Sequence, residues 1–187
     1  MSRRERTDDA DERLLQIWAA KRNGDAQYLI GALRDPDYRS TAAKFVGELG
    51  VVEAIAPLLP LLEAADPHAR AAAATALAQL GARQALPRLR EMAAHDEESF
   101  VRSWAIAALG EIGDPSDVDL ILPFLRDPSA RVRGAAAWAL GHLGDIRALE
   151  PLRAARKELR RSPMEWHMHR RVYKQSIDAL ERQGSRQ

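Results

Sequence analysis

Residues 127–152, which read DPSARVRGAAAWALGHLGDIRALEPL, decide the fold. Asp127 before Pro128 is typical of a helix start, because the aspartate caps free amide groups and the fixed φ of proline suits the first turn. The alanines and leucine that follow recur at three- and four-residue spacing, which indicates a helix with a buried stripe. Gly144 then ends the helix, since glycine tolerates the left-handed conformation that turns the chain. A second helix follows, so the segment predicts a helical hairpin.

The same hairpin occurs four times in the 187 residues. The aspartates that open the units are 30 or 31 residues apart: Asp35, Asp66, Asp96 and Asp127. The glycines that close them are 31 or 32 residues apart: Gly50, Gly81, Gly113 and Gly144. Eleven residues before each glycine stands an arginine: Arg39, Arg70, Arg102 and Arg133. A fixed period of this length predicts stacked supersecondary units that share one continuous core.

The composition agrees with a helical protein that has no thiol chemistry. Alanine supplies 34 residues and leucine 23, whereas aromatic residues make up only 5%, which disfavours a β-sandwich or barrel. The absence of cysteine excludes disulfides, thiolate metal sites, iron–sulfur clusters and cysteine catalysis. The longest apolar stretch, residues 54–62, is too short to cross a bilayer, and residues 1–13 lack the apolar core of a secretion signal. We therefore expect a cytoplasmic protein without a membrane partner.

The units resemble HEAT-like repeats of the short bacterial type, a class named after phycobilisome lyases. Residues 127–152 match its motif D-P-x-x-x-V-R-x-x-A-A-x-A-L-G-x-L-G-D-x-x-A-L-x-P-L almost in full. The resemblance implies an all-α fold, a right-handed alpha-alpha superhelix (HEAT-like solenoid) of about ten to eleven helices. We expect a single HEAT-repeat domain at residues 10–183, with an N-terminal cap unit at 10–32, four repeats at 33–162 and a C-terminal capping helix at 163–183. Residues 1–9 and 184–187 are expected to form disordered tails.

The expected capping helix has both a start signal and an apolar face. Ser162-Pro163-Met164-Glu165 predicts a capping box with proline at the first helical position. One packed face is predicted for five residues of this helix: Met168, Val172, Tyr173, Ile177 and Leu180. In the repeats, Leu109 and Leu140 occupy equivalent slots and are both predicted to be buried.

The four arginines at the repeat period form a ladder: Arg39, Arg70, Arg102 and Arg133. We interpret it as structural, each arginine tying one repeat to the next through loop carboxylates and carbonyls, for which bidentate pairing suits arginine. The alternative is a row that binds anions.

The second helices of the repeats are expected to line the concave face, where solenoids bind extended partners. Six residues are candidates for binding there: Pro60, Arg88, Glu91, Asp119, Pro123 and Glu150. On the first helices, Trp104 and Trp138 fall on one side of neighbouring units. They predict either packing contacts or an aromatic patch that a partner covers.

The C-terminal end is basic. Residues 51–152 carry nine basic and fourteen acidic side chains, a net of −5, whereas residues 153–187 carry ten basic and four acidic ones, a net of +6. Helical spacing groups the basic residues into two stripes: Arg153, Arg156, Lys157 and Arg160, then His167, Arg170, Arg171 and Lys174. They are interpreted as the solvated face of a terminal cap, or as a dock for an acidic protein segment or nucleic acid. We do not expect nucleic acid as the partner, because the acidic middle repels it and few aromatics interleave.

No catalytic or metal-binding constellation is evident. The five histidines include no pair at i and i+4 and no His-Glu dyad, and no nucleophile stands beside a base. We therefore predict no metal and no cofactor, and favour a non-catalytic scaffold or adaptor that binds another protein on the concave face. Two alternatives stay open. The resemblance implies a phycobilin-lyase-like subunit or assembly factor, for which Arg88 is the one clear inner-face arginine; the basic C-terminal helices allow nucleic-acid binding.

Overall fold

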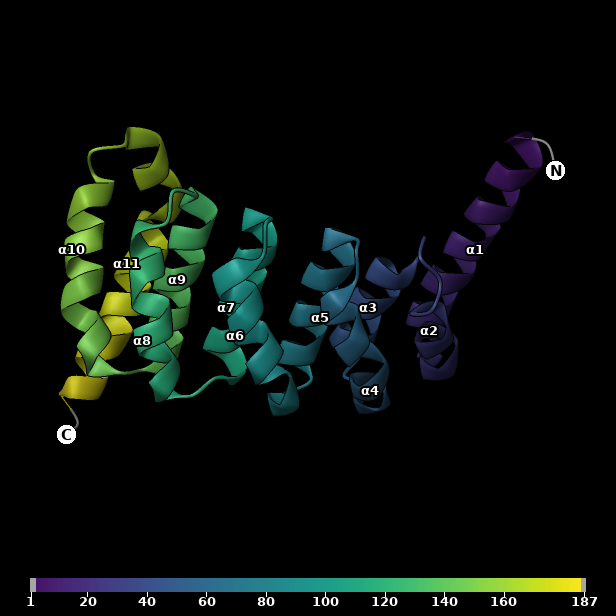
Figure 1. Ribbon diagram of the computed structural model, residues 1–187, viewed down its shortest axis with the longest axis horizontal. Helices are drawn as coiled ribbons and strands as arrows, with labels where there is room; N and C mark the ends of the chain where they lie inside the picture. The colour runs from purple at the N-terminus through teal and green to yellow at the C-terminus, as the bar shows by residue number, and fades with distance from the viewer. Residues whose placement is uncertain (1–2, 186–187) are drawn as a thin grey trace. The chain divides into compact units, whose positions relative to one another are not determined.

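The computed structural model describes residues 3–185, with side chains from Asp11 onward (Figure 1). Every regular element in this range is a helix, which confirms the all-α class. Helix α1 (Arg3–Asn23) begins inside the segment expected to be a tail, because no glycine or proline interrupts residues 3–23. Helix α11 (Pro163–Gly184) reaches the other expected tail. The outermost residues of both tails, 1–2 and 186–187, lie outside the described residues.

The chain divides into two compact units, Met1–Leu80 and Gly81–Gln187. The division falls inside the second repeat, and the expected single domain stays a prediction. The first unit holds α1, α2 (Ala26–Ala32), α3 (Arg39–Glu48), α4 (Ile55–Leu58) and α5 (Pro67–Gln79). Its 3-10 helices are η1 (Val52–Ala54) and η2 (Leu59–Glu63). Helix α3 packs against α5, and α2 packs against α1 and α3, around the buried side chains of Leu29, Phe45 and Leu77.

The second unit has two layers of helices. The first-helix layer contains α7 (Ser99–Ile112), α9 (Ala130–Leu143) and α11, and α9 packs against both neighbours. The second-helix layer contains α6 (Leu86–His95), α8 (Val118–Ile121) continued by η5 (Leu122–Arg126), and α10 (Leu149–Leu159). Short 3-10 turns lead into these second helices: η3 (Arg83–Ala85), η4 (Pro115–Asp117) and η6 (Ile146–Ala148). Figure 1 shows α6, α8 and α10 in front of α7, α9 and α11.

Small residues let the first helices approach closely. A Cβ atom added to Gly141 of α9 would lie 2.7 Å from the Cα of Ser176 on α11, and one added to Gly110 of α7 would lie 2.6 Å from the Cα of Ala139. Leu109 and Leu140, one residue before these glycines, are fully buried, as the sequence predicts. Alanine and glycine side chains are small enough to let the main chains of neighbouring helices come into close contact.

The left-handed turn that glycine permits is found at three of the four repeat closures. Gly50, Gly81 and Gly144 have φ angles of 68°, 66° and 74°. Gly113 differs, with φ −69° and ψ −168°. There the chain passes directly into a capping box between Asp114 and Asp117, so a left-handed residue is not required.

The start of α11 corrects two sequence predictions. Ser162 is the N-cap residue but makes no capping hydrogen bond with its side chain, and the side chain of Glu165 pairs with Arg133 of α9. Met168 is 63% exposed rather than packed. The packed face is rotated, since close contacts with Gly134 and Gly141 direct His169 and Ser176 of α11 toward α9. Other members of the predicted face, Tyr173, Ile177 and Leu180, are buried as expected.

Candidate functional site

Three of the four ladder arginines contact the loops that precede their own helices. Arg70 donates to the carbonyl oxygens of Ala64 and Ala65 at 2.8 and 3.2 Å. Arg102 and Arg133 make the equivalent pairs of bonds to the two residues that open their loops. The arginine side chains thus donate hydrogen bonds to loop carbonyl oxygens that lie outside the helical hydrogen-bond pattern.

Two ladder arginines also link forward to a carboxylate of the following element. Arg102 lies 3.5 Å from Asp127, and Arg133 pairs with Glu165 of the capping helix. The buried Nε of Arg39 has no hydrogen-bond partner among the described residues. These contacts are compatible with a structural ladder, whose contribution to stability stays a prediction.

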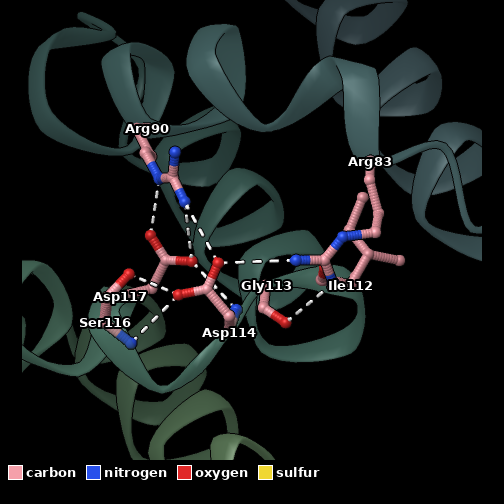
Figure 2. Close-up of polar contacts among 7 residues, drawn as sticks. All are labelled: Arg83, Arg90, Ile112, Gly113, Asp114, Ser116 and Asp117. Atoms are coloured by element: carbon pink, nitrogen blue, oxygen red, sulfur yellow. Dashed lines mark hydrogen bonds and ion pairs between the residues drawn. The ribbon is translucent and has the colours of Figure 1, made fainter.

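An ion pair with a buried carboxylate, absent from the sequence-based predictions, joins the second and third repeats (Figure 2). Asp117 is 2% exposed and accepts from Arg90 of α6, with Nε–Oδ1 2.6 Å and Nη2–Oδ2 3.2 Å. The same carboxylate accepts from the amide of Asp114 at 3.1 Å. The hydrogen bond to Asp117 raises the pKa of Arg90, and hydrogen bonds from Ser116 lower the pKa of Asp114.

The position of Asp117 within its repeat explains why the sequence alone does not predict the ion pair. Alanine occupies it in the other three repeats, as Ala54, Ala85 and Ala148, all fully buried. In a comparison of the repeats, an aspartate at this position looks like a weak match to the motif. The sequence Asp114-Pro115-Ser116-Asp117 is nevertheless a capping-box pattern, and that pattern could have identified Asp117 as a structural residue. Arg90, one turn before the next loop, supplies the positive charge that a buried carboxylate needs.

A groove on the second-helix layer of the second unit brings together two of the predicted binding residues. Asp119 and Pro123 lie on one side of it and Pro151 of α10 on the other, and the open volume is about 380 Å³. The remaining lining residues are Leu122, Leu125, Arg126, Ala154, Ala155 and Glu158. Proline lacks an amide hydrogen, and around Pro123 the short helix α8 continues as the 3-10 helix η5. Pro151 lies in the first turn of α10, which is a continuous α-helix from Leu149 to Leu159. The floor is apolar and the rim is charged, an arrangement suited to a peptide or a side chain of a partner.

The acids predicted on this face are each paired with an arginine. Glu91 lies 2.8 Å from Arg88, and Glu150 lies 2.6 Å from Arg153. Asp119 accepts from Arg147 at 3.0 Å.

Arg147 holds two carboxylates together at the end of the groove. It also donates to Asp145 through Nε and Nη2, at 2.9 and 2.7 Å. The hydrogen bond from Arg147 lowers the pKa of Asp145, and the two carboxylates raise the pKa of Arg147. The negative charge of this face is therefore largely balanced. Pro60 belongs to the first unit and is not one of the residues that line the groove.

The two tryptophans of the first helices have different surroundings. Trp104 is 45% exposed. Trp138 is half-buried and stacks on His142, with ring centroids 3.8 Å apart. Trp138 also borders a second hollow of about 540 Å³ between α9 and α11, which Trp104 does not line. A joint aromatic patch stays a prediction.

Three of the four basic residues in the first stripe contact acidic or aromatic side chains, whereas the exposed residues of the second stripe make no such contact with the described residues. Arg153 pairs with Glu150 and with Glu181 of α11, each at 2.6 Å. Arg156 and Arg160 lie 5.8 and 5.1 Å from the ring centre of Trp166. These contacts confirm that α10 and α11 are antiparallel neighbours. Four residues of the second stripe are exposed: His167, Arg170, Arg171 and Lys174.

The described residues hold no group of three or more His, Cys, Asp or Glu side chains that could bind a metal ion. None of the helices described is long and apolar enough to cross a membrane.

The repeat geometry defines the class of protein. A family model for HEAT repeats matches residues 26–110 and 101–163, so the chain belongs to the HEAT-repeat family. Within that family the resemblance to the phycobilisome-lyase type is confirmed by similar sequences. The chain is 34% identical over 161 residues to the phycocyanobilin lyase subunit alpha of Picosynechococcus sp., covering 73% of this chain and 60% of that protein.

Another curated protein supports the same resemblance to phycobilisome-lyase-type proteins. A phycobilisome maturation protein of Synechococcus elongatus is 33% identical over 62% of this chain and 56% of its own length. The chain spans between about half and three fifths of the length of these curated relatives.

Solved structures support the fold. The complex of CpcE and CpcF of phycocyanin lyase from Nostoc sp. PCC7120 contains a similar chain, with a TM-score of 0.58, 24% identity and 89% of both chains covered. An engineered protein has a TM-score of 0.54 at 18% identity, covering 89% of this chain and 83% of its own.

Proposed function

We propose that this chain is a protein-binding adaptor that holds a segment of a partner protein in the groove between η5 and α10. The observation that carries the proposal is the groove itself, with its apolar floor and charged rim. The name of the similar structure, a complex of two lyase proteins, supports a protein as the partner. Solenoid repeats present such surfaces to extended ligands.

A groove-filling substitution tests this proposal. Ala154 is exposed in the groove, so Ala154→Arg places a long charged side chain where the partner would lie. Ala56→Arg is the matched control, because Ala56 is exposed on α4 in the other unit. Proteins captured from the native host by the unchanged chain are identified by mass spectrometry, and their affinities are then measured for both variants. We expect roughly a tenfold or larger loss for Ala154→Arg alone. Equal affinities for the two variants would remove the groove from the interaction.

A second candidate function is that of a phycobilin-lyase-type subunit, favoured by the 34% identity to a phycocyanobilin lyase subunit. Arg88, the inner-face arginine, lies beside Glu91 on α6. Titration of phycocyanobilin with the protein, followed by absorbance, tests whether this chain binds the pigment. A saturable spectral shift that Arg88→Ala weakens and Arg126→Ala preserves supports this function. A spectrum that does not change contradicts pigment binding by this chain.

A further inference from the structure

One face of α11 carries positive charge that the fold does not use. It consists of His167, Arg170, Arg171 and Lys174, here called the basic face. All four are exposed, and none has an ion-pair partner among the residues that the structure describes. With 100° between successive residues of a helix, they fall within about a third of its circumference.

Other arginines of the second unit contrast with this face. Arg90, Arg102, Arg133, Arg147 and Arg153 each contact at least one carboxylate. Two acids of α11 are already engaged, Glu165 with Arg133 and Glu181 with Arg153. The charge of the basic face is therefore available to a partner rather than to the fold. Three exposed basic residues of α10 and the following turn add to the excess: Lys157, Arg160 and Arg161.

Exposed apolar side chains border the basic face. Met164 is 76% exposed and Met168 is 63% exposed. They lie seven and three residues before Arg171, so helical spacing places all three on adjoining strips of α11. Methionine is flexible and polarisable, which suits it to contact apolar side chains of varied shape.

Nucleic acid fits this surface less well than protein. The two aromatic side chains nearby are not free to stack with bases, because the guanidinium groups of Arg156 and Arg160 lie near Trp166 and Tyr173 is 1% exposed. The track from His167 to Lys174 is about 10 Å long at 1.5 Å per residue. That length matches only about three phosphate spacings of one strand.

We infer that the basic face and its two methionines form a docking surface for an acidic protein segment that also carries apolar side chains, such as an acidic amphipathic helix. Its carboxylates would pair with Arg170, Arg171 and Lys174, while its apolar side chains cover Met164 and Met168. The surface is distinct from the groove between η5 and α10, so this inference stands or falls independently of the proposed function. Charge complementarity of this kind sets the rate and specificity of association.

The probe is a fluorescein-labelled synthetic helix of alternating Glu and Leu faces, measured by fluorescence anisotropy with the full chain. The test variant combines Arg170→Glu, Arg171→Glu and Lys174→Glu. Its control combines Arg22→Glu, Arg34→Glu and Arg131→Glu, which changes the net charge equally at exposed arginines elsewhere. Circular dichroism verifies that both variants are folded.

We expect the test variant to bind the probe roughly tenfold more weakly, and the control variant to bind it within about twofold of the unchanged chain. Added salt weakens binding, and a probe with Gln in place of Glu does not bind. Combining Met164→Ser with Met168→Ser lowers the affinity for the Glu/Leu probe but not for polyglutamate.

Three outcomes overturn the inference. Equal losses in the two charge variants would show a general charge effect. Tighter binding of random-sequence duplex DNA, lost in the test variant, would assign the face to nucleic acid. Sedimentation equilibrium that reveals a dimer dissociated by the test variant would assign it to a second copy of the chain.

Discussion

The ion pair between Arg90 and Asp117 predicts a double-mutant cycle with a particular sign. Arg90→Leu leaves the Asp117 carboxylate, 2% exposed, with only the amide of Asp114 as a donor. Removing one partner of a fully buried pair costs about 3–5 kcal/mol. The side chain of Arg90 is 37% exposed, so water reaches the vacated site and we reduce the expected cost to about 2–3 kcal/mol.

The reverse substitution is expected to cost less. Asp117→Ala removes the cap on Asp114, worth about 1 kcal/mol. It does not strand the cation, because Asp114 lies 3.8 Å from Arg90 and water has access. Alanine also fills this slot without exposure in the other three repeats.

The double variant should therefore be more stable than Arg90→Leu alone, at a total cost of about 1 kcal/mol, since replacing both members of a buried pair is often nearly neutral. Unfolding in urea, followed by circular dichroism, measures the three free energies. Arg126→Leu, at an exposed arginine, controls for the change to leucine. Costs of Arg90→Leu and Asp117→Ala that add in the double variant would refute the reasoning, because additivity means that the two side chains do not depend on each other.

Three further predictions concern the packing of the repeats. Arg102→Ala should cost about 1–3 kcal/mol, and Arg34→Ala much less, because Arg102 donates to two loop carbonyls, one of them part-buried, which lose this donor; thermal melts compare them. Gly141→Ala should destabilise by about 1–3 kcal/mol, because its Cβ meets the main chain of α11, and chemical denaturation measures the loss. Burial, together with the nearby guanidinium of the ladder, lowers the pKa of His169, so the folded state binds fewer protons than the unfolded state. Stability should therefore be retained above the ordinary histidine pKa of about 6.5 and fall as the pH drops below it. The acid-induced drop in melting temperature should shrink in His169→Gln but persist in His167→Gln, and an unchanged drop in His169→Gln would contradict this assignment.

The sequence predicts those parts of the fold that every repeat shares. The burial of Leu109 and Leu140 follows from a slot that recurs at a fixed period. Gly144 likewise adopts the left-handed turn expected from its place after a helix.

Features that depend on one repeat meeting another could not be predicted in this way. Glu165 has the spacing of a capping residue, yet Arg133, 32 positions away in sequence, binds it instead. Met168 fits the spacing of a helical apolar stripe, yet it is exposed in the structure. The rotation of α11 about its axis is determined by the glycines of α9, against which His169 and Ser176 pack. The groove has the same origin: the repeat period predicts that Asp119 and Pro123 lie on the second-helix face, and only the arrangement of η5 and α10 shows that they share a hollow with Pro151.

The two layers of the second unit differ in stiffness. Helix α9 runs for 14 residues without a proline, and its close contact with α11 resists sliding. In the other layer the four residues of α8 pass into the five of η5 at Pro123, so fewer main-chain hydrogen bonds oppose bending there. A ligand that enters the groove can therefore spread η5 and α10 while the first-helix layer keeps its spacing. Occupancy of the groove would then change the curvature of the unit rather than its helix content.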